Sequence, residues 1–394
     1  MTKAPTQNQQ IRHLLFTVVL LLLGAGILIF GTDAMHMRPD EQLTFQNMQY
    51  SFSESMIRLA TRNNQAPLWW INTWVWQRLA GTSEYANRIN SILLSLLTMS
   101  VVYQIGRSWF GTRRAGWFAL LLLSVNAYFF VYGLEMRMYA LAILLTTLSM
   151  RVFYTWVTKK RWRDTIFYGL SVTALLYTDY YLGFVVLAQA AFFAVFYLWR
   201  MDWKLIRQGF AAALLAAIVW SPGIVLLYGQ LGFIDFAGEG GLKIPTDPTN
   251  LETLRDLLAI VSNGWAWLYA ALILFGLVRL WKKPAYWLVL FWLILSPGLV
   301  LLVNTQAPIF TQRYTSFFAP AIALALAAPL AAWNLPAKQP ASRSALLRWA
   351  AVLVVAALSL ATLPQHFPNR TPWRNILAQV SQQAQPGDVL LFST

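Results

Sequence analysis

Residues 14–41, LLFTVVLLLLGAGILIFGTDAMHMRPDE, join a run of apolar side chains to two adjacent carboxylates. The apolar part, residues 14–30, approaches the roughly 20 residues that a helix needs to cross a bilayer. Similar runs recur along the 394-residue chain, which is 58% hydrophobic and only 11% charged. Soluble domains are typically about 45–50% apolar and about 25% charged. The composition therefore predicts an all-α polytopic membrane protein and excludes a soluble globular domain.

The apolar runs predict about 11 membrane-spanning helices, each near the length needed to cross a bilayer. They cover residues 12–30, 86–105, 115–132, 138–156, 166–181, 183–199, 208–228, 264–281, 285–303, 314–332 and 346–363.

Basic residues are distributed unevenly between the two sides of these spans. With the N-terminus in the cytoplasm, the cytoplasmic turns are short and rich in lysine and arginine, and hold only two acids, Asp164 and Asp202. The positive-inside rule favours this orientation. Topology therefore explains the net charge of +15, and no nucleic-acid partner is needed. The predicted location is the cytoplasmic membrane, crossed many times.

Residues 1–363 are predicted to form a transmembrane catalytic domain with two long outer loops, residues 31–85 and 229–263. The first loop has apolar residues at helical spacing with polar residues between them, and then a tryptophan-rich stretch from Pro67 to Leu79. Both are predicted to be interfacial helices. The residues at helical spacing are Phe45, Met48, Phe52, Met56 and Leu59.

The chain ends on a pattern that is typical of a turn followed by a strand, residues 385–394. A lone strand is an unusual way to end a protein. We therefore expect residues 364–394 to be the start of an outer soluble α/β domain.

Two pairs of charged residues are candidates for chemistry. Asp40 and Glu41 begin the first interfacial helix, where Asp40 could be the N-cap and Glu41 could favour the helix dipole. Alternatively, the pair could supply a positioned general base. Glu135 and Arg137 lie in a short outer turn, where they could form a structural ion pair. Alternatively, the planar guanidinium of Arg137 could bind phosphate oxygens.

Two further charges lie on the same predicted face. Asp179 could be a solvated hairpin tip, and Arg313 could extend to the interface or bind an anionic lipid headgroup. The convergence of these groups favours an active site at the membrane boundary. With no cysteine and three histidines, a metal site built from thiolates or several imidazoles is not expected.

These motifs resemble the bacterial branch of the GT-C membrane glycosyltransferases, which is related to protein O-mannosyltransferases and to the aminoarabinose transferase that modifies lipid A. The chain departs from the family pattern at two places, where Gln65-Ala66 stands for His-Pro and Asp179 stands for His. The matching stretches are Asp40-Glu41, Pro67-Leu68, Ser83-Glu84 with Arg88, Glu135-Met136-Arg137-Met138-Tyr139, Tyr180 after Thr178, and Arg313-Tyr314.

The resemblance implies a GT-C fold and an inverting transfer of a sugar from a polyprenyl-phosphate donor to a hydroxyl of a protein, lipid or glycan. Asp40 would be the general base, with Glu41 beside it. Because both candidate metal ligands are changed, no obligatory metal or other cofactor is expected. The implied donor or phosphate contacts are Glu135, Arg137, Tyr139, Arg313 and Tyr314, and the possible acceptor or loop contacts are Arg62, Gln65, Arg88 and Asp179.

Three other functions are compatible with the sequence. A transporter or flippase of lipid-linked sugars would place ionisable residues near the midplane of its helices, whereas here they gather at one face. A polymerase or ligase of surface glycans would share the lipid-linked donor. A non-catalytic membrane scaffold would tolerate loss of the Asp40 carboxylate.

Overall fold

The computed structural model describes residues 6–231, 246–333, 341–368 and 370–385, and this part of the chain is helical with no β-strand. The predicted all-α membrane fold is therefore confirmed. The strand predicted near the end of the chain falls outside the described residues.

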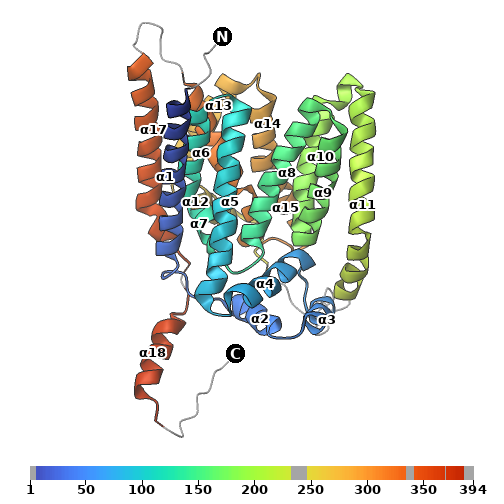
Figure 1. Cartoon of the computed structure of the whole chain (residues 1–394), viewed down its shortest axis with the longest axis vertical. Helices are drawn as coiled ribbons and strands as arrows, with labels where there is room; N and C mark the ends of the chain where they lie inside the picture. The colour runs from blue at the N-terminus through green and yellow to red at the C-terminus, as the bar shows by residue number, and fades with distance from the viewer. Residues whose placement is uncertain (1–5, 232–245, 334–340, 369, 386–394) are drawn as a thin grey trace.

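The long helices run side by side as one bundle (Figure 1). Eight of the described helices are long and apolar enough to cross a membrane, or up to 10 if each of two bent pairs is one span. Ten of the eleven predicted spans fall on these helices or bent pairs, whereas the span predicted at 166–181 falls on a 17-residue helix that is not among them. The bundle contains α1 (Gln7–Gly31), α5 (Glu84–Phe110), α8 (Tyr139–Lys159), α9 (Trp162–Thr178), α10 (Gly183–Phe196), α11 (Trp203–Leu231), α14 (Pro284–Leu290) continuing into α15 (Ser296–Asn304), α16 (Ala319–Ala332) and α17 (Ala341–Thr362).

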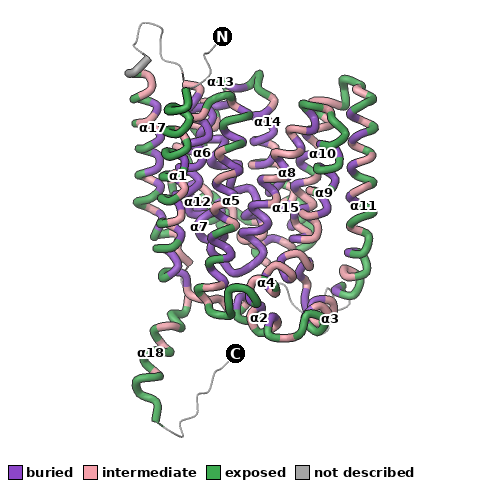
Figure 2. The backbone as a smooth tube through the Cα atoms, in the orientation of Figure 1, coloured by how far each residue is buried: buried purple, intermediate pink, exposed green. Residues whose placement is uncertain are grey.

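Burial distinguishes the central helices from the peripheral ones. The span that ends in α16 is 94% buried, whereas α1 and α11 carry many exposed apolar side chains (Figure 2). Small residues permit close packing at the centre. A Cβ at Gly116 of α6 (Arg113–Ser124) would lie 2.5 Å from the main-chain oxygen of Tyr103 on α5. The apolar surface of the peripheral helices is suited to contact with lipid.

Two helix pairs are sharply bent, and two asparagines hold the bends. α6 meets α7 (Ala127–Leu134) at 65°, and α12 (Leu251–Val261) meets α13 (Ala266–Leu280) at 74°. Asn126 Oδ1 accepts from the Phe129 amide at 3.0 Å, and its Nδ2 donates to Val261 O at 2.9 Å. Asn263, with φ +53°, accepts from the Ala127 amide at 3.0 Å. Each bend therefore braces the other, and α7 is directed towards the site.

Three short helices, α2 (Pro39–Met48), α3 (Phe52–Arg62) and α4 (Pro67–Ala80), cover the end of the bundle opposite the N-terminus (Figure 1). We call this end the loop face. The apolar stripe predicted over residues 45–59 is divided between α2 and α3, because Ser51 caps α3 by accepting from the Glu54 amide at 3.3 Å. Met48, Leu59 and Trp70 form a small separate core beneath them.

Substituting Asn126→Ala should lower the free energy of unfolding by about 2–4 kcal/mol, because it removes a helix cap and leaves buried groups without partners. Asn250→Ala is the matched control. Asn250 caps α12 by accepting from the Thr253 amide at 2.8 Å, but it is exposed, so its loss should cost about 1 kcal/mol. Thermal unfolding of purified protein in detergent compares the two variants. Equal losses would contradict the bracing role of Asn126.

Candidate active site

The turn between α7 and α8 is held by three side chains on one face of α5. Arg88 Nη1 donates to Leu134 O at 3.1 Å, Ser91 Oγ to Glu135 O at 2.8 Å, and Ser95 Oγ to Gly133 O at 3.0 Å. Spacings of three and four residues align these donors along a helix. The turn is therefore fixed where Glu135 and Arg137 project.

Glu41 is completely buried and joins α2 to this turn. Its Oε2 accepts from the Arg38 amide at 2.7 Å, which is a helix-capping contact. Its Oε1 accepts from the Met136 amide at 2.8 Å. The N-cap of α2 is Arg38, so the alternative in which Asp40 caps this helix is wrong, and Glu41 makes the capping contact instead. The Glu41 carboxylate also places Asp40 beside the α7–α8 turn.

Glu135 is the second buried carboxylate, only 1% exposed. Burial raises the pKa of Glu135, and the guanidinium of Arg370 opposes that rise. Arg370 pairs with Glu135 Oε1, and Arg38 Nη1 lies 3.3 Å from the same oxygen. Arg370 Nη1 also lies 3.5 Å from Glu41 Oε2. Arg38 and Arg370 were not predicted as site residues, although Arg38 is only two positions before Asp40.

Asp40 forms an ion pair across the site with Arg313. Asp40 Oδ2 lies 2.7 Å from Arg313 Nη1, and the Asp40 side chain is 41% exposed. Arg313 belongs to the short helix η4 (Gln312–Phe318), which Tyr128 of α7 anchors by donating to Gln312 O at 2.6 Å. Asp40 is thus the accessible carboxylate of the site, whereas Glu41 and Glu135 are enclosed.

Arg137 is a buried cation held by neutral acceptors. Its Nη1 donates to Thr44 Oγ1 at 2.9 Å and to the main-chain oxygen of Asp40 at 3.2 Å. With the Gln65 amide turned so that its oxygen faces the guanidinium, that oxygen accepts from Nη1 and Nη2 at 2.6 and 2.9 Å. Within the described part of the chain, no carboxylate lies within 4.0 Å of it. Its charge is therefore available to an anionic ligand.

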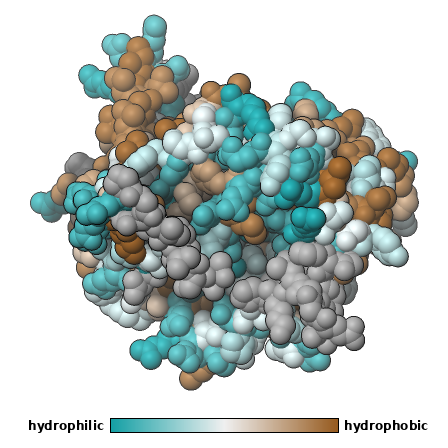
Figure 3. Space-filling view, turned by 90° about the horizontal axis from the view of Figure 1, so that it is seen from below, coloured by the Kyte–Doolittle hydropathy of each residue, from teal (hydrophilic) through white to brown (hydrophobic). Residues whose placement is uncertain are grey.

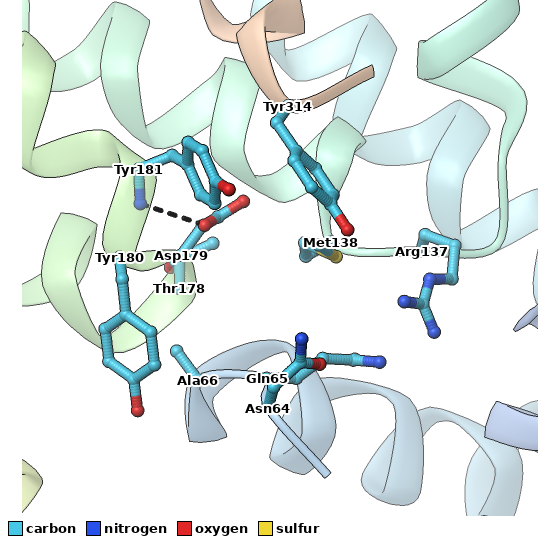
Figure 4. Close-up of a pocket in the computed structure, with 10 residues that line it drawn as sticks. All are labelled: Asn64, Gln65, Ala66, Arg137, Met138, Thr178, Asp179, Tyr180, Tyr181 and Tyr314. Atoms are coloured by element: carbon cyan, nitrogen blue, oxygen red, sulfur yellow. Dashed lines mark hydrogen bonds between the residues drawn. The ribbon is translucent and has the colours of Figure 1, made fainter. Parts of the chain in front are cut away.

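A small pocket of about 50 Å³ opens beside Arg137 (Figure 4). Gln65 and Asp179, the two positions that depart from the family pattern, both line it. Asp179 accepts from the Tyr181 amide at 3.0 Å, and burial raises the pKa of its carboxyl to about 7. The lining residues are Asn64, Gln65, Ala66, Arg137, Met138, Thr178, Asp179, Tyr180, Tyr181 and Tyr314.

These residues do not fit a divalent metal. Asp179 is the only carboxylate that lines the pocket, the Gln65 oxygen is engaged by Arg137, and a guanidinium faces the same space. Across residues 6–231, 246–333, 341–368 and 370–385, no group of three or more His, Cys, Asp or Glu side chains could hold a metal ion.

Several buried polar atoms around the site have no hydrogen-bond partner in the described part of the chain. They are Glu135 Oε2, Arg137 Nε, Tyr139 Oη and Arg313 Nε. Buried polar groups are normally satisfied, so their concentration here indicates a site built for a polar ligand. Hydrophilic residues gather on part of the loop face (Figure 3).

The remaining predicted residues occupy different positions. Tyr314 lines the pocket, with its ring beneath the Arg313 guanidinium, 5.4 Å from the ring centroid. Arg88 is fully buried and pairs with Glu84, with Nε to Oε1 2.9 Å. Arg62 is exposed at the end of α3. The structure therefore brings together most of the predicted set, but encloses Arg88 in the network and leaves Arg62 outside the pocket.

Comparisons with known proteins agree with this fold. Residues 64–226 match a family model described as dolichyl-phosphate-mannose-protein mannosyltransferase. No curated protein sequence matches the chain. The fold is that of the GT-C membrane glycosyltransferases, which confirms the resemblance seen in the sequence.

The solved structures include ArnT from Cupriavidus metallidurans bound to undecaprenyl phosphate. It is 14% identical with a TM-score of 0.65, and the match covers 94% of this chain and 81% of that chain. ArnT in the apo state matches with a TM-score of 0.63 at 14% identity, over 94% of this chain and 80% of that one. At 14% identity, this similarity shows that the two proteins share a fold and nothing more. The family model and the fold together support a membrane glycosyltransferase.

Substituting Asp179→Asn should stabilise the protein by an amount that grows with pH. The pKa of Asp179 is about 7 in the folded protein against an ordinary value of 3.8. From about pH 4 to about pH 7 the unfolded chain ionises this carboxyl while the folded protein keeps it protonated, so the wild type loses stability in that window. Three units of difference correspond to at most about 4 kcal/mol.

The measurement is the thermal midpoint of both proteins in detergent across that pH range. The difference should rise with pH and level off above about pH 7. A difference that does not change with pH would contradict the burial of an ionisable Asp179.

Proposed function

We propose that this protein is an inverting glycosyltransferase that moves a sugar from a polyprenyl-phosphate donor to a hydroxyl acceptor. The single observation that carries the proposal is Arg137, a buried guanidinium with neutral partners that lies beside the Asp40–Arg313 ion pair. A cation adjacent to an accessible carboxylate suits a reaction that expels a phosphate and removes a proton. The bound undecaprenyl phosphate named for ArnT supports a lipid phosphate as the leaving group.

In the proposed reaction, Asp40 accepts the proton of the acceptor hydroxyl as its oxygen attacks the anomeric carbon. The bond between that carbon and the phosphate oxygen breaks, and its electron pair leaves with the polyprenyl phosphate. Arg137 and Arg313 stabilise the negative charge that develops on the phosphate. Attack from the side opposite the leaving group inverts the anomeric centre. A lipid phosphate leaves without a strong general acid, so a single carboxylate base is enough.

Because Asp40 pairs with Arg313, binding of the donor would also change the contacts of Asp40. Asp40 Oδ2 accepts a hydrogen bond from Arg313 Nη1 at 2.7 Å, so this oxygen is already engaged before a donor binds. A bound phosphate competes for Arg313 and so releases Asp40. We propose that donor binding thereby activates the base, which delays proton removal until the donor is in place.

We propose that Glu135, Tyr139 and Tyr314 orient the donor next to these arginines, and that Gln65 and Asp179 contact donor or acceptor groups in the small pocket. No divalent metal is proposed, because among the described residues that line the pocket Asp179 supplies the one carboxylate and Arg137 places a positive charge in the same space. The structural contacts of Arg88 suit a supporting role.

The loop face is proposed to be the outer face of the cytoplasmic membrane. It is opposite the N-terminus (Figure 1), and the basic turns lie on the N-terminal side, as the positive-inside rule requires of a cytoplasmic N-terminus. The acceptor then comes from the cell envelope.

A transporter or flippase, and a polymerase of lipid-linked glycans, remain the alternatives. The clustering of the described site charges in the loops and helix ends of one face favours an enzyme over a transporter, whose ionisable groups concentrate near the midplane. Release of free polyprenyl phosphate in detergent, where no second compartment exists, separates transfer from transport. The length of the product separates a single transfer from polymerisation.

Purified protein should transfer sugar from a polyprenyl-phosphate sugar in the presence of EDTA, and Asp40→Asn should reduce turnover by about 10²–10⁴-fold, the usual contribution of a general base. The amide cannot accept the proton, although the main-chain contact of residue 40 is kept. Radiolabelled sugar in the product and free polyprenyl phosphate are measured together.

The matched control is Glu54→Gln, which alters an exposed carboxylate on α3 that pairs with Arg58. It should leave turnover within about twofold, as expected of a surface pair. Full turnover in the Asp40→Asn variant would disprove the base assignment, and a strict requirement for added Mg²⁺ or Mn²⁺ would disprove the metal-free reaction.

A further inference from the structure

The segment that follows the last membrane helix contacts the loop face before the chain projects away from the bundle (Figure 1). α17 leads into η5 (Leu363–His366), and α18 (Trp373–Gln383) projects away from the other helices (Figure 1). Between them, Phe367 stacks on Phe130 of α7, with ring centroids 5.0 Å apart and planes at 14°. This contact brings the segment to the side of α7 that leads into the site.

Arg370 extends from this segment into the buried carboxylates. Its side chain is only 5% exposed. Nη1 donates to His36 O at 2.8 Å and lies 3.5 Å from Glu41 Oε2, while Nη2 donates to Glu135 Oε1. One guanidinium therefore contacts both enclosed carboxylates and the chain that precedes α2.

Arg374 anchors the same segment at a different place. Its Nη2 donates to Glu84 Oε1 at 2.6 Å, and its Nη1 donates to Asp33 O at 3.0 Å. It contacts neither Glu41 nor Glu135 among the described interactions. The chain thus offers two arginines, four residues apart, that both hold the segment, but only one of them reaches the carboxylates.

We propose that Arg370 is a positioning residue for the transfer reaction, which holds Glu41 and Glu135 together and thereby sets the relative positions of Asp40 and Arg137. Asp40 precedes Glu41 on α2, and Arg137 follows Glu135 by two residues in the α7–α8 turn. The segment after the membrane domain is then a working part of the active site. This inference rests on the proposed glycosyltransferase function.

The argument is electrostatic as well as geometric. Several charged and titratable groups face Glu135. They are Glu41, Arg38, Arg313, Arg370, Tyr132 and Tyr139. Arg88 Nη1 lies 4.0 Å from Glu41 Oε1. Without Arg370, two enclosed carboxylates would face each other with fewer cations between them. They would then share a proton or move apart.

Either change at Glu41 and Glu135 would alter the positions of Asp40 and Arg137. Glu41 accepts from the Met136 amide, so separation of the two carboxylates would move α2 away from the turn that carries Arg137. Displacement of catalytic groups by about 1 Å can reduce rates by about 100-fold.

The test compares four variants of the full chain, Arg370→Gln, Arg370→Lys, Arg374→Gln and Arg374→Lys, in the transfer assay with a polyprenyl-phosphate sugar. Arg370→Gln should lower kcat by about 10–100-fold with little change in the donor KM. Arg370→Lys keeps the charge and should recover part of the loss. Arg374→Gln should stay within about threefold of the wild type, because it removes the contacts with Glu84 and Asp33 while Arg370 keeps its own contacts with Glu41 and Glu135.

The pH profile separates electrostatic positioning from a general loss of structure. The ratio of wild-type to Arg370→Gln turnover should rise as the pH rises, because burial raises the pKa of Glu135 and the two carboxylates repel most when both are ionised. A ratio that stays constant with pH, or an equal loss in Arg374→Gln, would overturn the proposal. If Arg370→Gln does not fold, the test is the comparison of Arg370→Lys with Arg374→Lys. Equal turnover of these two variants would overturn the proposal.

Failure of this inference is distinct from failure of the proposed function. No transfer by the wild type would refute the glycosyltransferase itself. Transfer by the wild type and equally by Arg370→Gln would refute only the role of Arg370.

Discussion

The site depends on the compensation of two carboxylates, Glu41 and Glu135, that are enclosed at the loop face. Removing an ion from water costs several kcal/mol unless partners replace its hydration. Here the partners are two main-chain amides and three guanidinium groups, supplied by residues that are far apart in the chain: Arg38 before α2, Arg88 on α5 and Arg370 after α17. Loss of one partner would leave a buried charge uncompensated. The network therefore joins the first loop, the α7–α8 turn and the segment beyond the last helix.

Asp40 and Arg137 differ from this enclosed network in being available to a ligand. The contacts of Glu41 and Glu135 hold α2 against the α7–α8 turn. By contrast, the Asp40 side chain is 41% exposed. The hydrogen-bond partners of Arg137 among the described residues are all neutral. The rigid ion pairs are thus separated from the reactive groups by one or two residues. In the proposed reaction, such an arrangement would position the base and leave the charge of the cation free to stabilise the departing lipid phosphate.

The sequence predicted those features of the fold that depend on local composition. Apolar length predicted the spans, and charge asymmetry placed Asp40, Glu135, Asp179 and Arg313 at one end, where the structure brings them together. The bend at Asn126 could not be predicted, because hydropathy is continuous across residues 115–132 and the cause is a contact with Asn263. Arg370 was missed for a similar reason. Its partners are 235 residues or more away, and the tail was interpreted as the start of another domain.

Recognition of a lipid phosphate is the central claim, and binding to the purified full-length protein tests it most directly. Undecaprenyl phosphate should bind saturably and at least about tenfold more tightly than undecaprenol, since each charge-assisted hydrogen bond contributes about 1.5–3 kcal/mol. Arg137→Gln should reduce that preference, whereas Arg58→Gln, a change at a surface arginine of α3, should not. Equal binding of the phosphate and the alcohol, or an unchanged preference in Arg137→Gln, would contradict the account.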